Sequence, residues 1–349
     1  MAKKVEKVKN DLGKKVRSIT TLNNCEGYDS LFIDNIKGIK SDLLSKENKS
    51  LLPKVNDSKR DALHYTNLSV YTNTKRKMPF YVAYNIDGEG KKKVIRDLDF
   101  IPEPRVSADD QLNDGFYKLR KGKGKGFDKG HMAANNELAW NPDAQTKSYQ
   151  TFFYTNTCPQ AAILNRGLWK TLETYFINES NETVNTKINV FTGPILKDND
   201  PTYVDDKSFK LPLHFYKVVV FKFNKKFFST GFIMSQKQAL IDLKLIEAPL
   251  KLEMATIAKI TPPPFEDFSY KDIFQVNVED ISQETGIPFA WSGVTPLKVE
   301  GGKKRLKTID EIENSKQAKA KLSTIKSKSN LISEKFFIED TKIGFVFPA

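Results

Sequence analysis

The chain has 349 residues and 39% of them are hydrophobic, which suits one large domain or two small ones around an apolar core. Lys and Arg outnumber Asp and Glu by 56 to 43, a formal net charge of +13, which favours polyanionic partners but does not determine a fold. The two cysteines, Cys25 and Cys158, exclude a disulfide framework and a zinc ribbon. We expect two thiols, with one disulfide between them as the alternative.

The N-terminal residues 1–24 are rich in lysine and contain few large apolar side chains, so we expect a poorly ordered basic extension. No apolar segment of a secretory signal peptide follows the first lysines. No run of residues is long and apolar enough for a transmembrane helix. We therefore expect a soluble protein without a membrane partner, either cytoplasmic or exported by a signal-independent route.

Two strands are expected in the first half of the chain. Residues 63–71 and 80–85 are rich in aromatic and β-branched side chains and are separated by a short polar turn, a pattern that predicts a hairpin. Residues 100–117 have the composition of a loop. The run 121–126 alternates lysine with glycine and lacks the end of a P-loop, so it is either a cationic loop or a solvated turn.

The second half predicts three more strands, at 188–194, 211–221 and 227–234, and a short helix at 278–286 that glycine terminates. Strands on both sides of a helical centre, without alternation of strand and helix, favour an α+β fold with a mixed or antiparallel sheet. We expect the main domain at 25–296 and a charged C-terminal appendage at 297–349, whose apolar end docks as a strand.

The centre of the chain contains the residues with the clearest chemical pattern. One histidine, two asparagines and a carboxylate recur within the segments 128–132, 155–160 and 164–173. If Asn165 begins a helix through Phe176, Leu168 and Leu172 face the core. Asn165 and Glu173 then lie about 80° apart around the helix. An amide oxygen and a carboxylate on one face suit Mg²⁺, which keeps several of its waters.

His131 is the candidate general base, because a neutral imidazole has an ordinary pKa of about 6.5 and can take a proton from water. Each residue also has a simpler explanation. His131 could be a packing histidine, Asn165 a helix N-cap, and Glu173 a solvated carboxylate. Their order along one short segment, rather than any one of them, points to phosphodiester hydrolysis at a single metal ion.

The three motifs resemble those of the DNA/RNA non-specific endonucleases, whose active site is the ββα-metal, or His-Me, finger. That family carries Asp-Arg-Gly-His, then Asn-x-x-Pro-Gln, then Asn-x-Gly-x-Trp-x-x-Leu-Glu. Here these motifs stand at 128–131, 156–160 and 165–173. The similarity extends over about residues 25–295, and the fold it implies is an α+β domain with an embedded ββα-metal finger and flanking helices.

The resemblance implies roles for individual residues. His131 is the general base, Asn165 the direct ligand of one Mg²⁺, which Mn²⁺ can replace, and Glu173 the holder of a metal-bound water. Asn156 orients the histidine or the metal ligands, and Arg105 contacts the scissile phosphate. Further residues at the motifs, assigned to substrate binding, are Lys129, Arg166 and Asp128.

The chain departs from the family pattern at two positions. Lys129 replaces the usual arginine and keeps its charge but not its bidentate fork, and Glu103 replaces an aspartate before Pro104.

The resemblance implies a Mg²⁺-dependent endonuclease that cuts DNA and RNA without sequence preference and leaves 5′-phosphate ends. Lys129 permits the alternative of a catalytically silent nucleic-acid-binding protein, and a phosphodiesterase of small substrates is a third class. We also expect an inhibitor or immunity protein as a partner, and a monomer or homodimer.

Overall fold

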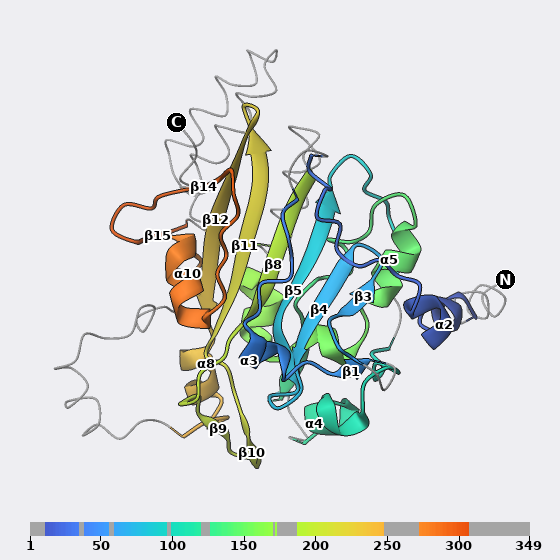
Figure 1. Cartoon of the computed structure of the whole chain (residues 1–349). Coiled ribbons are helices and arrows are strands. Elements are labelled where there is room, and N and C mark those ends of the chain that lie inside the picture. The colour runs from blue at the N-terminus through green and yellow to red at the C-terminus, as the bar shows by residue number, and fades with distance from the viewer. Residues whose placement is uncertain are drawn as a thin grey trace, which may run out of the picture.

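The computed structural model describes residues 11–34, 38–55, 59–95, 99–119, 126–169, 172, 187–247 and 272–306. The architecture there is a large twisted sheet with short helices on both faces (Figure 1), which confirms the predicted α+β class. The sheet has the order β15-β13-β12-β11-β8-β5-β4-β3, with β14 beside β12. All neighbours are antiparallel except β12 and β14.

The strands of the large sheet are β3 (Leu63–Tyr65), β4 (Leu68–Asn73), β5 (Met78–Asp87), β8 (Lys187–Ile195), β11 (His214–Phe223), β12 (Lys226–Ser235), β13 (Phe274–Val276), β14 (Val294–Pro296) and β15 (Lys303–Arg305). Three two-stranded sheets are formed by β1 (Lys54–Val55) with β2 (Lys59–Arg60), β6 (Phe127–His131) with β7 (Thr157–Ala161), and β9 (Thr202–Tyr203) with β10 (Asp206–Lys210). The α-helices are α2 (Ile19–Leu22), α3 (Lys46–Lys49), α4 (Asp114–Tyr117), α5 (Ala144–Gln150), α6 (Ala162–Leu164), α8 (Lys237–Asp242) and α10 (Val278–Thr285). The other helical turns are η1 (Ala108–Asp110), η2 (Tyr154–Asn156) and η3 (Asn165–Trp169).

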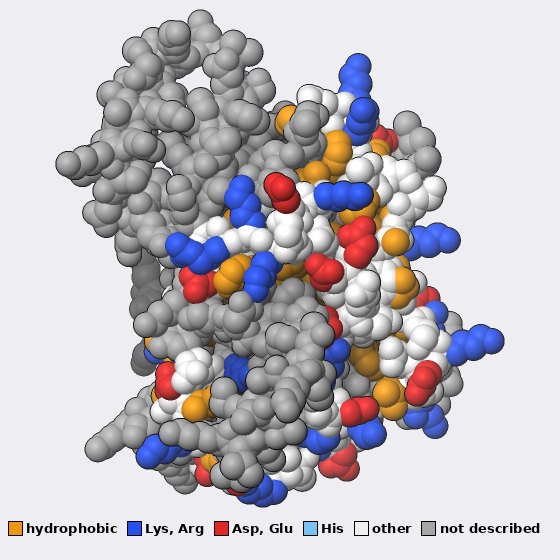
Figure 2. Space-filling view, turned by 90° about the vertical axis from the view of Figure 1, so that its left-hand side faces the viewer, with side chains coloured by type: hydrophobic (Ala, Val, Ile, Leu, Met, Phe, Trp, Pro, Cys, Tyr) orange, Lys and Arg blue, Asp and Glu red, His pale blue; other side chains and the backbone are white. Residues whose placement is uncertain are grey.

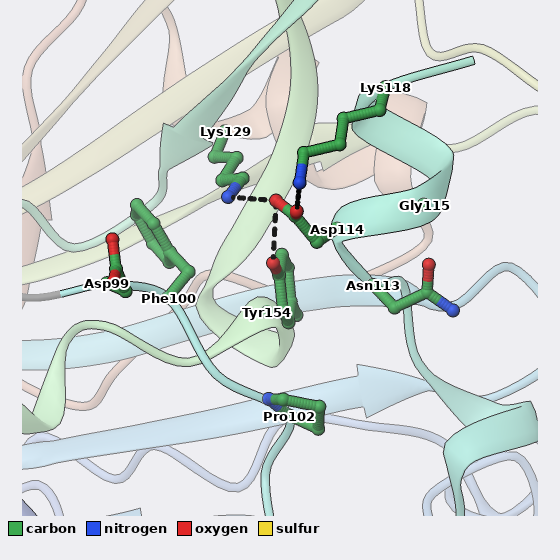
Figure 3. Close-up of a pocket in the computed structure, with 9 residues that line it drawn as sticks. All are labelled: Asp99, Phe100, Pro102, Asn113, Asp114, Gly115, Lys118, Lys129 and Tyr154. Atoms are coloured by element: carbon green, nitrogen blue, oxygen red, sulfur yellow. Dashed lines mark hydrogen bonds and ion pairs between the residues drawn. The ribbon is translucent and has the colours of Figure 1, made fainter.

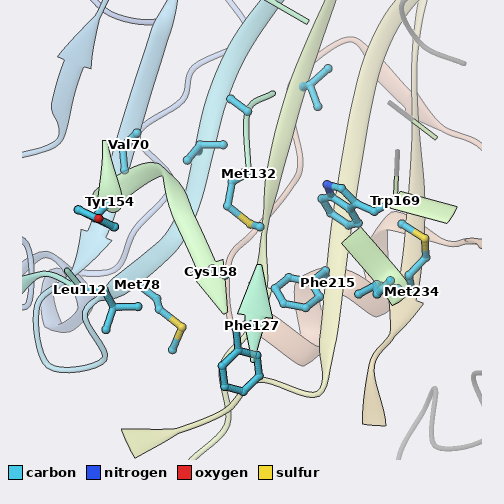
Figure 4. Close-up of a cluster of buried hydrophobic side chains, with 14 of the residues drawn as sticks. Val70, Met78, Leu112, Phe127, Met132, Tyr154, Cys158, Trp169, Phe215 and Met234 are labelled. Atoms are coloured by element: carbon cyan, nitrogen blue, oxygen red, sulfur yellow. The ribbon is translucent and has the colours of Figure 1, made fainter. Parts of the chain in front are cut away.

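The sheet separates two hydrophobic cores, because alternate side chains of each strand point to opposite faces. On β5, Val82 and Tyr84 belong to one core, and Tyr81 and Ala83 to the other. The first core also contains side chains of the β6–β7 pair and Trp169. Figure 4 shows part of this first core. The candidate site is therefore built on the first face of the sheet.

The second face is covered in part by α10, which lies in front of the sheet in Figure 1, and in part by side chains of residues 28–52. Ile281 of α10 packs so closely on β12 that a Cβ on Gly231 would lie 2.5 Å from its Cδ1, so a larger residue there would force Ile281 to shift. The predicted helix at 278–286 is confirmed, and Gly286 ends it with φ +68°, in the left-handed region.

The strand predicted at 63–71 is two strands. Leu63 pairs with Val70 and Tyr65 with Leu68, so the chain reverses at residues 66 and 67. Asn67 adopts a φ of +58°, which asparagine tolerates better than most residues. The predicted hairpin with its turn at residues 73–76 is confirmed as β4 and β5, which are joined by residues 74–77. The segment 100–117, predicted as loop, contains η1 and α4, whose first turns are capped by Ser107 and Asn113.

The large sheet contains residues on both sides of position 296, since β15 pairs with β13. Leu306 beside it is buried in the first core. The predicted N-terminal extension includes Val16 and Leu22, which are buried. The boundaries at 24 and 296 stay predictions, and the expected C-terminal strand lies outside the described residues.

Both cysteines are free thiols, Cys25 half-buried and Cys158 buried. None of the helices in the described ranges has the length and apolar character needed to cross a membrane. On the face in Figure 2, the described Lys and Arg side chains are interspersed with Asp and Glu.

Candidate active site

The motif residues meet on a strand–strand–helix unit. Strand β6 pairs antiparallel with β7, with His131 opposite Thr157 and Asp128 opposite Gln160. Gly130 lies on β6 between Asp128 and His131, and a Cβ there would lie 2.1 Å from Oε1 of Gln160. A larger residue at position 130 would therefore displace Gln160. The chain leaves β7 directly into α6 and then the π-helical turn η3. The unit therefore brings the segments 128–131, 156–160 and 165–169 together.

His131 is the last residue of β6 and keeps 9% of its surface exposed. Its ring lies 4.7 Å from the ring centroid of Phe100 and 5.1 Å from that of Phe152, edge to face with the latter. These two rings restrict the orientation of the imidazole. The aromatic contacts were not readable from the sequence, because Phe100 lies in a segment without periodicity.

Asn156 fixes the backbone that follows His131. Its side chain is fully buried. Its Oδ1 accepts a hydrogen bond from the backbone N of Ala133 at 3.1 Å, and its Nδ2 donates to the carbonyl oxygens of Ala133 and Thr151 at 2.9 Å each. Its own carbonyl accepts from the backbone N of Met132 at 2.9 Å. These contacts are those of a residue that acts through the backbone beside His131.

Asn165 has helical dihedral angles, φ −61° and ψ −42°, and α6 begins three residues before it with Ala161 as the N-cap. It is therefore not the helix N-cap that the sequence left open. A π-helical turn follows in place of the regular helix that we predicted from Asn165, and such turns are frequent at functional sites. Leu172 is buried as predicted, and so is Trp169, while the side chain of Leu168 lies outside what the structure describes.

Asp128 connects the strand to the helix. Its Oδ2 accepts a hydrogen bond from Nδ2 of Asn165 at 3.0 Å, and both its oxygens accept from Arg166, at 2.8 and 2.7 Å. Arg166 is 74% exposed and Asp128 18%. Hydrogen bonds to Asp128 raise the pKa of Arg166. Asp128 is thus partnered by two motif residues and orients the amide of Asn165.

The amide oxygen of Asn165 is the group at this site that could hold a metal ion. Because Nδ2 of Asn165 faces Asp128, Oδ1 is the opposite end of the amide, and a carboxamide oxygen is a hard donor suited to Mg²⁺. Within the described ranges no group of three or more His, Cys, Asp and Glu side chains is placed to hold a metal. Glu173 lies outside the described residues.

Lys129 takes part in a charged cluster at a pocket of about 680 Å³ (Figure 3). Its Nζ donates to Asp114 at 2.7 Å and lies 5.5 Å from the ring centroid of Phe100. Asp114 also accepts from Lys118 and from the hydroxyl of Tyr154, the latter at 3.3 Å. Hydrogen bonds from Lys118 and Lys129 lower the pKa of Asp114 to about 2.

The same cluster affects the ammonium of Lys129. Burial lowers its pKa, but hydrogen bonds to Asp114 and Tyr154 outweigh this, so that the pKa is raised and the group stays protonated. Sequence reasoning missed Asp114, which lies in the segment 100–117 predicted as loop, and Lys118, which directly follows it. A capping pattern at Asn113 was the available signal for α4.

Arg105 is placed in a buried ion pair. Its Nε and Nη2 donate to the two oxygens of Glu103 at 2.9 and 3.0 Å. Its Nη1 donates to the carbonyl oxygens of Leu22 and His64 at 3.1 and 3.3 Å. Glu103 has no exposed surface and accepts a further hydrogen bond from Tyr65. These contacts favour a structural role for Arg105 over the phosphate contact that the resemblance implied.

The sequence matches the family of DNA/RNA non-specific endonucleases over residues 47–295. The uncharacterized protein y4fB of Sinorhizobium fredii is 30% identical over 246 residues, which cover 68% of this chain and 34% of that protein. Human mitochondrial endonuclease G is 30% identical over 144 residues, 38% of this chain and 43% of that protein. Nuclease C1 of Cunninghamella echinulata var. echinulata is 31% identical over 154 residues, 41% of this chain and 58% of that protein.

The chain thus matches less than two thirds of the length of each of these curated relatives. A solved structure described as an EndoG/EndoGI complex aligns with a TM-score of 0.47 at 20% identity, over 70% of this chain and 91% of that one. The family match covers the three motifs and confirms the resemblance. The chain belongs to the DNA/RNA non-specific endonuclease family.

Proposed function

We propose that the chain is a Mg²⁺-dependent endonuclease that hydrolyses phosphodiester bonds of DNA and RNA without sequence or sugar preference, leaving 5′-phosphate ends. The observation that carries the proposal is the hydrogen bond from Asn165 to Asp128. It ties the candidate metal ligand to the strand that ends in His131. Family membership supports the same reaction.

In this proposal His131 is the general base. An imidazole with an ordinary pKa of about 6.5 can accept a proton from the water that attacks phosphorus. Phe100 and Phe152 hold the ring against rotation. Asn156 fixes the backbone after His131 and so acts as a positioning residue.

Asn165 is the proposed direct metal ligand through Oδ1, with Glu173 holding a metal-bound water. A divalent ion bound there supplies positive charge for the phosphate and for the leaving oxygen. Asp128 keeps the amide of Asn165 turned with its oxygen outward. Mn²⁺ is the expected replacement, since it accepts the same oxygen ligands.

Lys129 and Arg166 are the proposed substrate-binding cations. Both are partly exposed and both are held by carboxylates, Asp114 and Asp128. Lysine and arginine that bind phosphates carry no sequence information, so binding weakens steeply with salt and is indifferent to the bases. A net charge of +13 supports a polyanionic substrate.

Digestion of plasmid DNA and of RNA by the wild type and by His131→Ala, each with Mg²⁺ and with EDTA, tests the proposal. We expect cleavage of both substrates by the wild type in Mg²⁺ only. Cleavage that survives both EDTA and the loss of His131 would refute the mechanism. Comparison of a dinucleotide with plasmid separates a nuclease from a phosphodiesterase of small substrates.

A catalytically silent nucleic-acid-binding protein is the second candidate. Lys129 permits it, because its ammonium keeps the charge that binds phosphate but is held by Asp114 and lacks the bidentate fork of the family's arginine. Tight DNA binding without cleavage in Mg²⁺ or Mn²⁺ would support that function.

An inhibitor or immunity protein remains the proposed protein partner, since an unrestrained non-specific nuclease endangers the cell that makes it.

A further inference from the structure

A buried ion pair lies beneath the candidate site, in the middle of the sheet. Lys217 on β11 and Glu137, in the segment after His131, both have 0% exposed side chains, and Nζ lies 3.2 Å from Oε1. Tyr84 on β5 joins them: its hydroxyl donates to Oε2 of Glu137 at 2.9 Å and accepts from Nζ of Lys217 at 2.8 Å. Three segments far apart in sequence thus meet at one point.

The pair contacts both arms of the site. Oε2 of Glu137 accepts a hydrogen bond from the backbone N of Ala134 at 2.9 Å, three residues after His131. Nζ of Lys217 lies 5.0 Å from the ring centroid of Trp169, four residues after Asn165, about one helical turn away. Trp169 also packs edge to face on Phe215, two residues before Lys217 on the same side of β11 (Figure 4).

Stability alone does not account for such a pair. Two charges taken out of water lose hydration that their mutual attraction seldom exceeds, and apolar residues of similar size often serve a fold equally well. Lys217 stands among Val218, Val219 and Val220, where an apolar residue would match the strand. What the pair adds is fixed geometry, because its hydrogen bonds have direction whereas hydrophobic contact has none.

We propose that Glu137 and Lys217 are positioning residues of the nuclease site, which hold the end of β6 and the helix of Asn165 to one point on the sheet. This inference rests on the proposed function. Glu137 sets the backbone beyond His131, and Lys217 sets Trp169 and with it the turn that carries Asn165. Neither residue touches substrate in this account.

The decisive variant replaces both charges at once, Glu137→Met with Lys217→Met, which leaves no unpaired ion. We expect a folded protein with a moderately lower melting temperature, because the Tyr84 hydroxyl and the backbone N–H of Ala134 lose their charged partners. We expect kcat to fall about tenfold or more and the affinity for Mn²⁺ alone, measured by calorimetry without substrate, to fall similarly, as for other residues that orient metal ligands. KM should change little. A folded double variant with wild-type kcat and Mn²⁺ affinity overturns the inference.

Should the double variant fail to fold, a matched pair of smaller changes decides. Tyr84→Phe removes the hydroxyl that joins the pair, and Tyr216→Phe removes a buried hydroxyl from the opposite face of the sheet, where it bonds to the carbonyl of Phe80 at 3.3 Å. We expect a lower kcat and weaker Mn²⁺ binding for Tyr84→Phe only. Equal values for the two variants overturn the inference. A wild type that neither cleaves nor binds Mn²⁺ would instead refute the proposed function.

Discussion

The carboxylate of Asp128 accepts a hydrogen bond from Nδ2 of Asn165 at 3.0 Å, and this contact joins the first strand of the site to its helix. Arg166 donates two hydrogen bonds to the same carboxylate. One acidic side chain on β6 therefore determines which end of the Asn165 amide would face the proposed metal ion. The motifs of the site therefore do not only lie side by side. Asp128 of the first motif orients the side chain of Asn165 in the third.

Replacing Asp128 should lower the affinity of the site for a divalent metal ion. In Asp128→Ala the amide of Asn165 loses its partner, and we expect Mn²⁺ affinity to fall about tenfold or more. Calorimetric titration with Mn²⁺ measures this. Arg166→Ala is the matched comparison, because it removes the exposed ion pair but leaves the bond between Asn165 and Asp128. Equal losses in the two variants would contradict the orienting role of Asp128.

Replacing Asp114 should strengthen nucleic-acid binding. Asp114→Asn removes the carboxylate that holds Lys129 and Lys118, so both ammonium groups become available to phosphate. These ion pairs are partly exposed and worth about 1 kcal/mol or less, so we expect Kd for DNA to fall about two- to fivefold.

DNA binding measured in EDTA at low salt checks this expectation. Asp109→Asn, on the neighbouring turn η1, is the control for a general loss of negative charge. In a Lys129→Gln background the effect of Asp114→Asn should shrink. An undiminished effect there would show that Asp114 acts independently of Lys129.

Arg105→Met should destabilise the protein without disabling the site. Removal of the guanidinium leaves the buried carboxylate of Glu103 without its ionic partner, a change that costs about 3–5 kcal/mol. Denaturant unfolding measures this loss. The kcat of the folded fraction should match the wild-type value. A stable variant with a strongly reduced kcat would restore the catalytic role that the resemblance implied.

The lowered pKa of Lys147 predicts that the free energy of unfolding depends on pH. Burial lowers its pKa to about 7, while nearby Asp143 and Asp87 raise it in part. In the unfolded chain lysine keeps its proton up to about pH 10.4. Unfolding therefore takes up a proton between about pH 7 and this value, and raising the pH over that window favours the folded state.

The melting temperature at pH 7 and pH 9 measures this contribution. The wild type should gain more stability than Lys147→Met over the same interval. Equal gains would show that Lys147 does not lose its proton in the folded protein.

The sequence was most informative where the determining contacts are local. The hairpin of β4 and β5 and the helix terminated by Gly286 follow from turn and capping residues a few positions apart. The motifs at His131 and Asn165 could be recognised because their order along the chain is specific. Asn67 shows the limit of this reading, since one left-handed residue divided a predicted strand into two.

The contacts that complete the site are long-range and could not be read in this way. Asp114 reaches Lys129 across 15 residues and Glu137 reaches Lys217 across 80, with no pattern in the sequence to pair them. The contacts of Arg105 could not be read from the sequence for the same reason. Its partners include the carbonyls of Leu22 and His64, which only the folded chain brings near.

Chemical rescue tests the central claim most directly, namely that the imidazole of His131 removes the proton from the attacking water. Plasmid cleavage in Mg²⁺ would be followed for the wild type, His131→Ala and the control His214→Ala, with and without added imidazole. We predict a loss of about 10²-fold or more for His131→Ala alone and partial recovery with imidazole as its unprotonated fraction rises with pH. Wild-type rates for His131→Ala without imidazole would contradict the account.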